Sequence, residues 1–350
     1  MNEKIIAFAD GSAAESLLHD TLARPLQDLR ISVMDRCNFR CPYCMPEDKY
    51  HKDFQFLRSS ERLSFDEILR VAQIFAGIGV HKVRITGGEP LLRPGLSDLI
   101  GDLSRMDGID DIALTTNGIL LAQQAAALKA AGLHRVTVSL DSLDEQVFLQ
   151  LSGGRGSKYR VLEGIREAIQ AGLGPIKVNT VVKRGVNDHT VLDLIEHFRG
   201  TGVIVRFIEY MDVGTINHWQ FGDTVRSAEL VEKINSRWPI QPVERNYHGE
   251  VASRYQFADG HGEIGFISSV SEPFCGSCTR ARLSSDGQLF TCLFASRGTD
   301  LRGPMRAGAS DAELRSIVEA VWLKRTDRYS EVRAEQAEPG EKIEMYYIGG

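Results

Sequence analysis

The sequence lacks several features that would direct a protein into or across a membrane. It contains no run of 18 apolar residues, so a transmembrane helix is not expected. The stretch before Leu26 has no long apolar segment and carries several acidic residues, so we expect neither a secretory signal nor a transit peptide. These absences favour a cytoplasmic protein. Cysteine is also scarce, with six residues in 350.

Positive charge is in the minority, with 41 Lys and Arg residues against 47 Asp and Glu residues and a formal net charge of −6. A broad basic surface is therefore not expected, which argues against nucleic acid or an anionic membrane as partner. A local basic pocket for an anion is still allowed, because a cleft can focus potential against the overall charge.

The length and composition predict an α/β protein with one large and one smaller domain. Strand patterns alternate with helix patterns, which implies parallel pairing with right-handed crossovers. A partial barrel and an open doubly wound sheet both satisfy this alternation. The expected strands are 29–33, 83–86, 111–115, 135–140, 177–182 and 203–209, and the expected helices are 65–76, 96–106, 120–131, 158–171 and 187–199, the last capped by Asn187.

The pattern changes after about residue 240. Short strand-like runs occur at 251–258 and 262–270, and residues 280–293 fit a hairpin that turns at Asp286-Gly287. A helix with a capping box follows at 310–324. We therefore predict an N-terminal extension at 1–25, a main domain at 26–240 and a smaller C-terminal α+β domain at 241–350.

All six cysteines fall in two clusters, and clustered thiols in a reducing compartment favour metal over disulfide. The first cluster, Cys37, Cys41 and Cys44, follows the first strand, where parallel α/β proteins place their sites. Three thiolates can hold three irons of a four-iron cluster and leave the fourth iron open. Zinc is the alternative, with His51 as a fourth ligand.

The second cluster consists of Cys275, Cys278 and Cys292. The hairpin can return Cys292 to the C-x2-C pair. On spacing alone, zinc and an iron–sulfur cluster fit this second set equally well.

Basic residues accompany these cysteines. Arg280 and Arg282 point to the same face of an extended segment, and two adjacent guanidinium groups suit a polyphosphate. Arg30, Arg84 and Lys177 lie in otherwise apolar strands, where an unpaired charge is costly to bury. Three such residues favour a cavity that binds an anion.

The first cysteine motif, with Tyr43 before its last cysteine, resembles the signature of the radical S-adenosylmethionine (SAM) superfamily. The resemblance implies a partial (β/α)6 TIM-like barrel and an open iron that chelates SAM. Gly88, in a Gly-Gly-Glu-Pro motif after the second strand, would bind SAM together with Tyr43, Ser139 and Met211.

A closer resemblance rests on further motifs: Arg-Ile-Thr-Gly-Gly-Glu-Pro, Thr-Thr-Asn-Gly, Val-Ser-Leu-Asp-Ser-Leu, Cys-x2-Cys-Thr-Arg-x-Arg and a terminal Gly-Gly. From about residue 26 to 350 the chain resembles the GTP-cyclising radical SAM enzymes of molybdenum-cofactor biosynthesis. This implies two [4Fe-4S] clusters, held by the two cysteine sets. The implied GTP contacts are Arg30, Arg84, Thr115, Lys177, Arg280, Ala281 and Arg282.

In that family a 5′-deoxyadenosyl radical removes the ribose 3′ hydrogen of GTP, and C3′ then attacks C8 of guanine. The resemblance implies catalytic roles for Arg282 and for Gly349 and Gly350, whose tail enters the barrel. It also implies an electron donor such as flavodoxin or ferredoxin, and cyclic pyranopterin monophosphate synthase as the next enzyme. A homodimer would be compatible with it.

Three other readings stay open at this point. A radical SAM enzyme with an auxiliary cluster could act on another substrate, such as a peptide, although the Arg280 and Arg282 pair would then lack a role. A zinc-stabilised binding module would need no catalysis. An electron-transfer protein would not leave both clusters one cysteine short.

Overall fold

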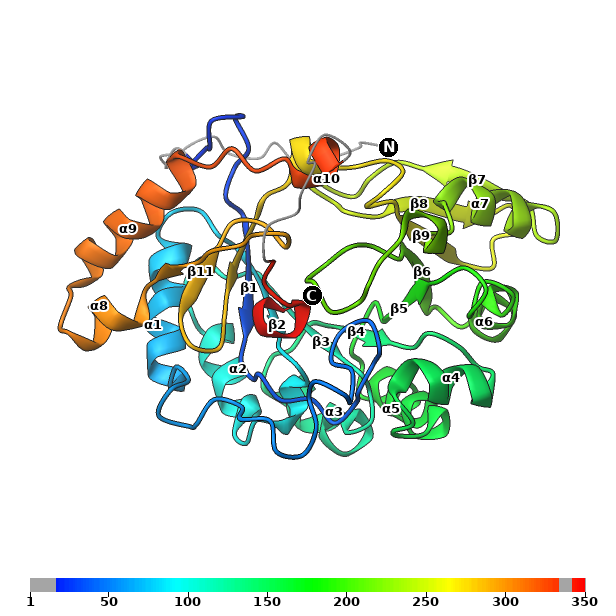
Figure 1. Ribbon diagram of the computed structural model, residues 1–350, viewed down its shortest axis with the longest axis horizontal. Helices are drawn as coiled ribbons and strands as arrows, with labels where there is room; N and C mark the ends of the chain where they lie inside the picture. The colour runs from blue at the N-terminus through cyan, green and yellow to red at the C-terminus, as the bar shows by residue number, and fades with distance from the viewer. Residues whose placement is uncertain (1–16, 334–341, 350) are drawn as a thin grey trace, which may run out of the picture.

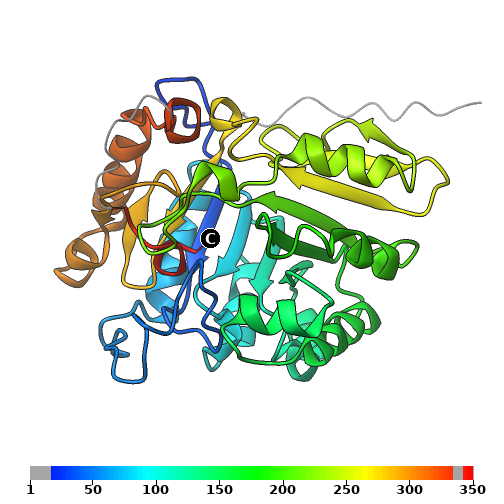
Figure 2. The same cartoon turned by 45° about the vertical axis from the view of Figure 1, so that its right-hand side comes forward.

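The structure is a computed structural model that describes residues 17–333 and 342–349. One twelve-stranded sheet runs through the molecule in the order β12-β11-β10-β1-β2-β3-β4-β5-β6-β9-β8-β7. Its centre is a curved row of six parallel strands with helices on the outer face (Figures 1 and 2). The predicted partial (β/α)6 barrel is therefore confirmed.

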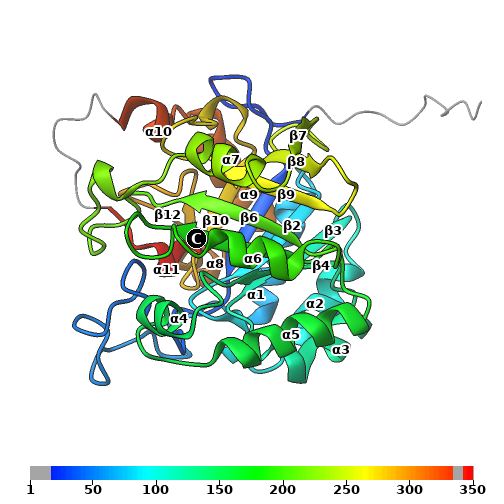
Figure 3. The same cartoon turned by 90° about the vertical axis from the view of Figure 1, so that its right-hand side faces the viewer.

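The central strands are β1 (Asp28–Ser32), β2 (Lys82–Thr86), β3 (Asp111–Thr116), β4 (Arg135–Ser139), β5 (Lys177–Val182) and β6 (Ile204–Glu209). The helices around them are α1 (Phe65–Ala76), α2 (Leu96–Ser104), α3 (Leu121–Ala130), α4 (Glu145–Ser152), α5 (Lys158–Gln170) and α6 (Val191–Phe198). The sequence analysis missed α4, a short helix capped by Asp144. Helices α3 and α5 pack side by side on the outside of the barrel (Figure 3).

The expected cap of α6 is wrong. Thr190 precedes the helix, and Asn187 is fully buried one turn earlier. The Asn187 side-chain amide donates to the carbonyls of Asp141 and Val181, and its oxygen accepts from Lys183. Asn187 therefore joins the ends of β4 and β5, which is a tertiary role that a local capping pattern does not reveal.

The C-terminal part of the chain extends both edges of the barrel sheet. Strand β9 (Glu263–Ile267) pairs parallel with β6, and β10 (Arg280–Leu283) pairs parallel with β1. The remaining elements are α7 (Ser227–Asn235), β7 (Ile240–Val243), β8 (Ser253–Phe257), β11 (Gln288–Phe290), β12 (Thr299–Asp300), α8 (Arg302–Arg306), α9 (Asp311–Leu323), α10 (Tyr329–Val332) and α11 (Met345–Ile348). The sheet thus continues across residue 240, and the predicted domain division there stays a prediction.

Strand alternation separates the core from the barrel interior. Leu29 and Ile31 of β1, and Val83 and Ile85 of β2, are at most 1% exposed and belong to the main hydrophobic core. The residues between them, Arg30 and Arg84, have the opposite orientation because successive side chains of a strand point to opposite faces. Within residues 17–333 and 342–349, no helix has the length and apolar character to cross a membrane.

Candidate functional site

The first cysteine cluster lies on the loop that follows β1, at the carboxyl end of the barrel strands. Buried Arg40 holds this loop, since its guanidinium donates to the carbonyls of Cys37 and Tyr50 at 2.8 and 2.7 Å. The carbonyl of Cys41 accepts from the amides of Cys44 and Met45. Hydrogen bonds within the loop backbone and from Arg40 therefore fix the conformation of this loop.

The Gly-Gly-Glu-Pro segment after β2 packs directly against this cysteine loop. The Gly88 amide donates to the Met34 carbonyl at 2.6 Å, and the Glu89 amide donates to the Arg36 carbonyl at 2.8 Å. A Cβ atom on Gly88 would overlap the carbonyl oxygen of Arg36 and would lie 3.1 Å from the amide nitrogen of Cys37. The backbone approach explains why glycine is needed at position 88.

This contact gives a first prediction. We expect Gly88→Ala to push the two segments apart and to cost about 1–3 kcal/mol of stability, as overpacking of a tight site does. Thermal unfolding would measure the loss, and equilibrium dialysis of anaerobically reconstituted protein would show weaker SAM binding. Gly222→Ala is the control, because no atom lies within 4 Å of its added Cβ. An unchanged Gly88→Ala protein would contradict the close-approach explanation.

Three buried polar residues support the loop from neighbouring strand ends. Glu89 accepts from the Thr116 hydroxyl at 2.7 Å and from the Asn117 amide at 2.8 Å. Burial raises the pKa of Glu89 to about 7. The Asn117 side chain in turn lies 3.8 Å from the Cys37 sulfur. Asp141 accepts from the Tyr43 hydroxyl at 2.7 Å, and burial raises its pKa to about 6.

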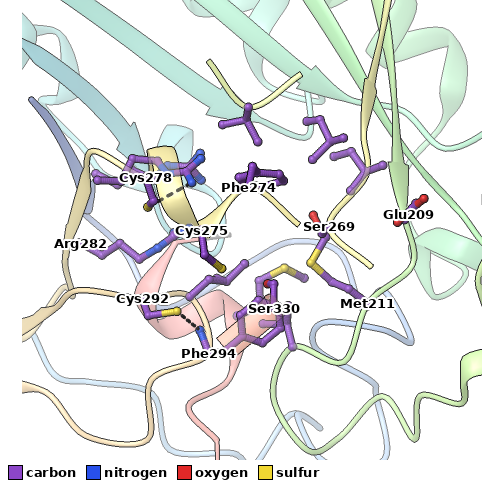
Figure 4. Close-up of a pocket in the computed structure, with 18 of the residues that line it drawn as sticks. Glu209, Met211, Ser269, Phe274, Cys275, Cys278, Arg282, Cys292, Phe294 and Ser330 are labelled. Carbon is purple, nitrogen blue, oxygen red and sulfur yellow. Dashed lines mark hydrogen bonds between the residues drawn. The ribbon is translucent and has the colours of Figure 1, made fainter. Parts of the chain in front are cut away.

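The second cysteine cluster lines a cavity at the open side of the barrel. The cavity has an empty volume of about 1450 Å³, which includes the solvent-filled space at its mouth. Cys275, Cys278 and Cys292 gather beside Arg282 on one side, and Met211 lies across from them (Figure 4). The cavity also reaches Tyr43 of the first cysteine loop. One cavity therefore extends from the second cysteine set to Tyr43 of the first cysteine loop.

The donor sets fit iron–sulfur clusters better than single metal ions. All six cysteines are free, and no three Cys, His, Asp or Glu side chains in the described part of the chain converge closely enough to hold one ion. For the first set, the zinc alternative depended on His51, which is exposed and whose Nδ1 accepts from the Asp53 amide. Three thiols can hold three irons of a four-iron cluster and leave the fourth iron open.

Burial shapes the acidity of these thiols. It raises the pKa of Cys37 to about 11, and it also raises the pKa values of Cys41 and Cys44. Burial acts in the same direction on Cys278, but Arg280 and Arg325 outweigh it and lower that pKa to about 6. Metal binding would release the protons that the first three thiols retain.

Three arginines form a row across adjacent strands inside the barrel. Arg30 of β1 is in register with Arg84 of β2 on one side and with Arg282 of β10 on the other. Burial lowers the pKa of Arg30 strongly, and the neighbouring arginines lower it further; for Arg282 the pKa falls to about 10. A bound anion would relieve this repulsion.

Two of these cations donate only to neutral acceptors. Arg84 donates to the hydroxyls of Thr115 and Thr137 at 3.4 and 3.2 Å, and Arg282 donates to the Gly349 carbonyl. Arg280 instead donates to the Cys278 sulfur at 3.2 Å. The positive charges of Arg84 and Arg282 are therefore not compensated by their hydrogen-bond partners.

The remaining predicted site residues have varied positions. Lys177 is the first residue of β5 and does not line the cavity, and burial and nearby arginines lower its pKa to about 7. The Ala281 side chain belongs to the hydrophobic core, so its backbone alone could reach a ligand. Ser139 ends β4 and is partly buried. Gly350 lies outside the described residues.

Sequence reasoning missed several residues that line the cavity, among them Arg206, Asn179, Tyr247 and Glu250. Arg206 carries the same signal as Arg30, since it is a charge within the apolar strand β6, and burial lowers its pKa to about 9. Its guanidinium donates to the Asn179 side chain at 3.0 Å. Tyr247 and Glu250 sit on a loop that gives no local signal.

The C-terminal tail enters the centre of the barrel (Figure 1). Gly349 is buried there with φ of 70°, and a Cβ atom would overlap the Thr86 side chain. Asp212, next to Met211, holds the tail. It accepts from the Lys342 ammonium at 2.6 Å, from the Arg333 guanidinium at 2.8 Å and from the Tyr329 hydroxyl at 2.5 Å.

We expect Asp212→Asn to release this tail, because a neutral amide cannot compensate two partly buried cations. Trypsin cleavage after Lys342 should accelerate by about tenfold or more, the factor that corresponds to 1.4 kcal/mol of lost docking energy. Glu319→Gln, which removes an exposed ion pair with Arg315, is the matched control. An unchanged cleavage rate would show that Asp212 does not hold the tail.

The same contact has a defined pH dependence. Burial alone would raise the pKa of Asp212, but its hydrogen bonds to Lys342 and Tyr329 and the charge of Arg333 bring it below its ordinary value of 3.8. A lowered folded-state pKa contributes stability above the ordinary value, and this stability is lost as the pH falls below it. Tail docking should therefore be stable at neutral pH and weaken in acid below about pH 4.

Fold and first cysteine loop together define a radical SAM protein. The Radical SAM superfamily matches residues 31–198, and the Molybdenum Cofactor Synthesis C family matches residues 203–331. The chain is similar to a protein of Xanthomonas axonopodis pv. citri (strain 306) named GTP 3′,8-cyclase, with 54% identity over 333 residues that cover 95% of this chain and 99% of that protein. An Acidothermus cellulolyticus protein of the same name is 49% identical over 358 residues, with the same coverage. The chain belongs to the GTP 3′,8-cyclase family.

A solved structure has the same fold. Streptococcus suis SuiB, bound to S-adenosylmethionine, aligns with a TM-score of 0.60 over 93% of this chain and 76% of that one, at 13% identity. This likeness concerns the fold alone. Membership of the radical SAM superfamily brings a [4Fe-4S] cluster and SAM to the chain.

Proposed function

We propose that this protein converts GTP to (8S)-3′,8-cyclo-7,8-dihydroguanosine 5′-triphosphate, the first step of molybdenum-cofactor biosynthesis. The observation that carries the proposal is one cavity lined by an in-register row of arginines and by three cysteines, with Tyr43 of the other cysteine loop at its wall. A polyphosphate, a purine and SAM are the ligands that these three features suit.

Cys37, Cys41 and Cys44 would hold the first [4Fe-4S] cluster, and Tyr43, Gly88, Ser139 and Met211 would contact SAM. When bound, this cluster supplies the electron that cleaves SAM to a 5′-deoxyadenosyl radical, which takes the 3′ hydrogen of GTP. Arg40 and the Gly88 segment keep the loop in one shape. Such preorganisation matters because a primary-carbon radical reacts with whatever hydrogen lies nearest.

Arg30, Arg84 and Arg282 would bind the triphosphate, with Lys177 and Arg280 adding charge and with Thr115 and the Ala281 backbone completing the contacts. Guanidinium forks match phosphate oxygens. The pKa values of Arg30 and Arg282 are lowered by burial and further by neighbouring arginines, which supports a site that an anion stabilises. Binding energy from the phosphates, which do not react, would position the ribose for hydrogen transfer.

Cys275, Cys278 and Cys292 would hold a second [4Fe-4S] cluster, which would supply an iron without a cysteine ligand for binding the guanine. The C-terminal tail would close the cavity, with Gly349 held by Arg282 and Gly350 beyond it. Closure of this kind excludes water from a reactive intermediate. The cytoplasmic location, a flavodoxin or ferredoxin as electron donor, cyclic pyranopterin monophosphate synthase as the next enzyme and a homodimer belong to the same proposal.

The decisive experiment is anaerobic incubation of the reconstituted protein with SAM, dithionite and GTP, followed by mass spectrometry. We expect 5′-deoxyadenosine and a cyclised nucleotide that depends on GTP. GTP deuterated at C3′ should transfer deuterium to the 5′-deoxyadenosine. Formation of 5′-deoxyadenosine without any GTP-derived product would point to a radical SAM enzyme with another substrate.

A further inference from the structure

Two buried arginines contact the backbone of Cys275 and Cys278, the C-x2-C pair of the second cysteine set. The proposed reaction assigns these arginines no role. Arg24 is 1% exposed and Arg325 is 4% exposed. The Arg24 Nη1 donates to the Cys275 carbonyl at 2.9 Å and to the Asp327 carbonyl at 2.7 Å. The Arg325 Nη1 donates to the Cys278 carbonyl at 2.8 Å. Each cysteine of the C-x2-C pair therefore has its backbone held by a separate guanidinium.

The arginines come from segments far apart in the sequence. Arg24 belongs to the predicted N-terminal extension at 1–25, and Arg325 follows the end of α9. Asp20 joins them, with its carboxylate 2.5 Å from the Arg24 Nε and 3.4 Å from the Arg325 Nη1. Trp322 donates to the Arg24 carbonyl at 3.2 Å, and the Arg325 guanidinium lies 4.5 Å from its ring centre. The segment before β1 is thus tied to the second cysteine site.

The buried charges behind the cysteine pair do not cancel. Glu331 accepts from the Gly276 amide at 3.1 Å, but it is only partly buried and pairs with Arg328. Two buried guanidinium groups face one buried carboxylate, that of Asp20. Asp327 also pairs with Arg325 at 3.3 Å, but its side chain is 32% exposed and is therefore screened by water. The Arg24 Nη2 is buried without a hydrogen-bond partner. Arg280, on the opposite side, adds further positive charge near Cys278.

We infer that Arg24 and Arg325 are positioning residues for the second cluster, which fix the cysteine pair and place net positive charge behind it. The inference rests on the proposed function, because it requires a cluster at Cys275, Cys278 and Cys292. Charge and hydrogen bonds around the ligands set the potential of an iron–sulfur centre, and residues behind the ligands orient them. Positive charge favours the reduced cluster, which carries one more negative charge than the oxidised cluster. Asp20 opposes this effect.

The test isolates the second cluster in the full-length chain by replacing Cys37, Cys41 and Cys44 with alanine. In this background, Arg325→Gln, Arg325→Lys and Asp20→Asn are reconstituted anaerobically and titrated against dithionite, with detection by electron paramagnetic resonance. Arg315→Gln is the control, because that arginine lies on exposed α9 surface and pairs with Glu319. Circular dichroism confirms folding, and iron content is measured for each variant.

We expect the reduction potential of the second cluster to fall in Arg325→Gln, to stay near the parent value in Arg325→Lys and to rise in Asp20→Asn. Opposite shifts in two variants of one network would not arise from general loosening. In the otherwise unchanged chain, Arg325→Gln should also lose part of its second set of four irons while the first cluster keeps its iron. If Arg325→Gln cannot be folded, the Asp20→Asn and Arg325→Lys titrations decide.

Potentials and iron contents equal to those of the parent in folded Arg325→Gln and Asp20→Asn proteins would overturn the inference and leave the proposed function intact. Shifts of the same sign in both variants would also overturn it. An unsubstituted protein that binds only four irons would instead refute the second cluster, and with it both the proposed function in this form and the inference.

Discussion

Replacing Cys41 with alanine should abolish 5′-deoxyadenosine formation, whereas replacing Cys278 with alanine should leave SAM cleavage and abolish the GTP-derived product. Cys41 lies in the loop that Arg40 and the Gly88 segment shape, and Cys278 lines the cavity beside Arg280. A cluster that loses one of only three protein ligands has no spare cysteine in this chain to replace it. The two variants therefore separate the two halves of the reaction.

The measurement is product analysis by mass spectrometry together with iron content, under anaerobic conditions. Each variant should retain about four irons if the intact centre is a four-iron cluster. Cys292→Ala should behave like Cys278→Ala, since both belong to the second set. Loss of SAM cleavage in Cys278→Ala, with the first cluster's iron still present, would contradict the division of roles between the two sets.

Arg282→Ala should weaken the use of GTP by about 10- to 150-fold, the factor that corresponds to about 1.5–3 kcal/mol for a hydrogen bond to a charged group. Arg282 is 5% exposed, is in register with Arg30 and donates to the Gly349 carbonyl. The variant therefore loses its contact to the tail, and it would also lose the proposed phosphate contact. SAM cleavage should persist, because the first cysteine loop does not depend on this side chain.

Steady-state kinetics with GTP and a separate assay of 5′-deoxyadenosine would check this result. Arg282→Lys should give an intermediate loss, since lysine keeps the charge but not the planar fork. Arg254→Ala is the control, because Arg254 pairs with Glu263 on β8 and β9 and does not line the cavity. Loss of SAM cleavage in Arg282→Ala would show that its role is not phosphate binding.

Hydrophobic periodicity and the capping residues at helix ends predicted the barrel strands and most of the barrel helices. The capping box predicted for the helix at 310–324 is present at Ser310 with Glu313, and a second one at Ser64 with Glu67 begins α1. Such a box satisfies backbone groups within one turn, so a local pattern is enough to predict it. Asn187 shows the limit of such signals. It stands where a cap would stand, yet its bonds go to Asp141 and Val181 on other strand ends. Whether such a side chain caps its own helix or bonds to another segment depends on which groups the fold brings close to it.

The part of the candidate site that could be predicted consists of residues whose type and position alone indicate a function. Two sets of three clustered cysteines favour metal binding. Arginines inside apolar strands are costly to bury unless a partner or ligand compensates their charge, so both patterns indicate a site. Arg206 has the same signal and could have been found. Glu89, Asp141 and Asp212 are ordinary acidic residues in the sequence. Their roles follow only from their partners, such as Lys342, which lies 130 residues from Asp212.

By itself, the sequence determined the alternation of strands and helices, the two cysteine sets and the basic character of the strands between them. These features are local, because hydrophobic period, caps and ligand spacing act over a few residues. Tertiary structure alone decided that β9 and β10 join opposite edges of the barrel sheet and that Arg282 lies beside Arg30. It also decided that Arg24 donates to the carbonyl of Cys275, 251 residues away. Pairings of this length are set by the burial of whole faces against one another, which no local pattern encodes.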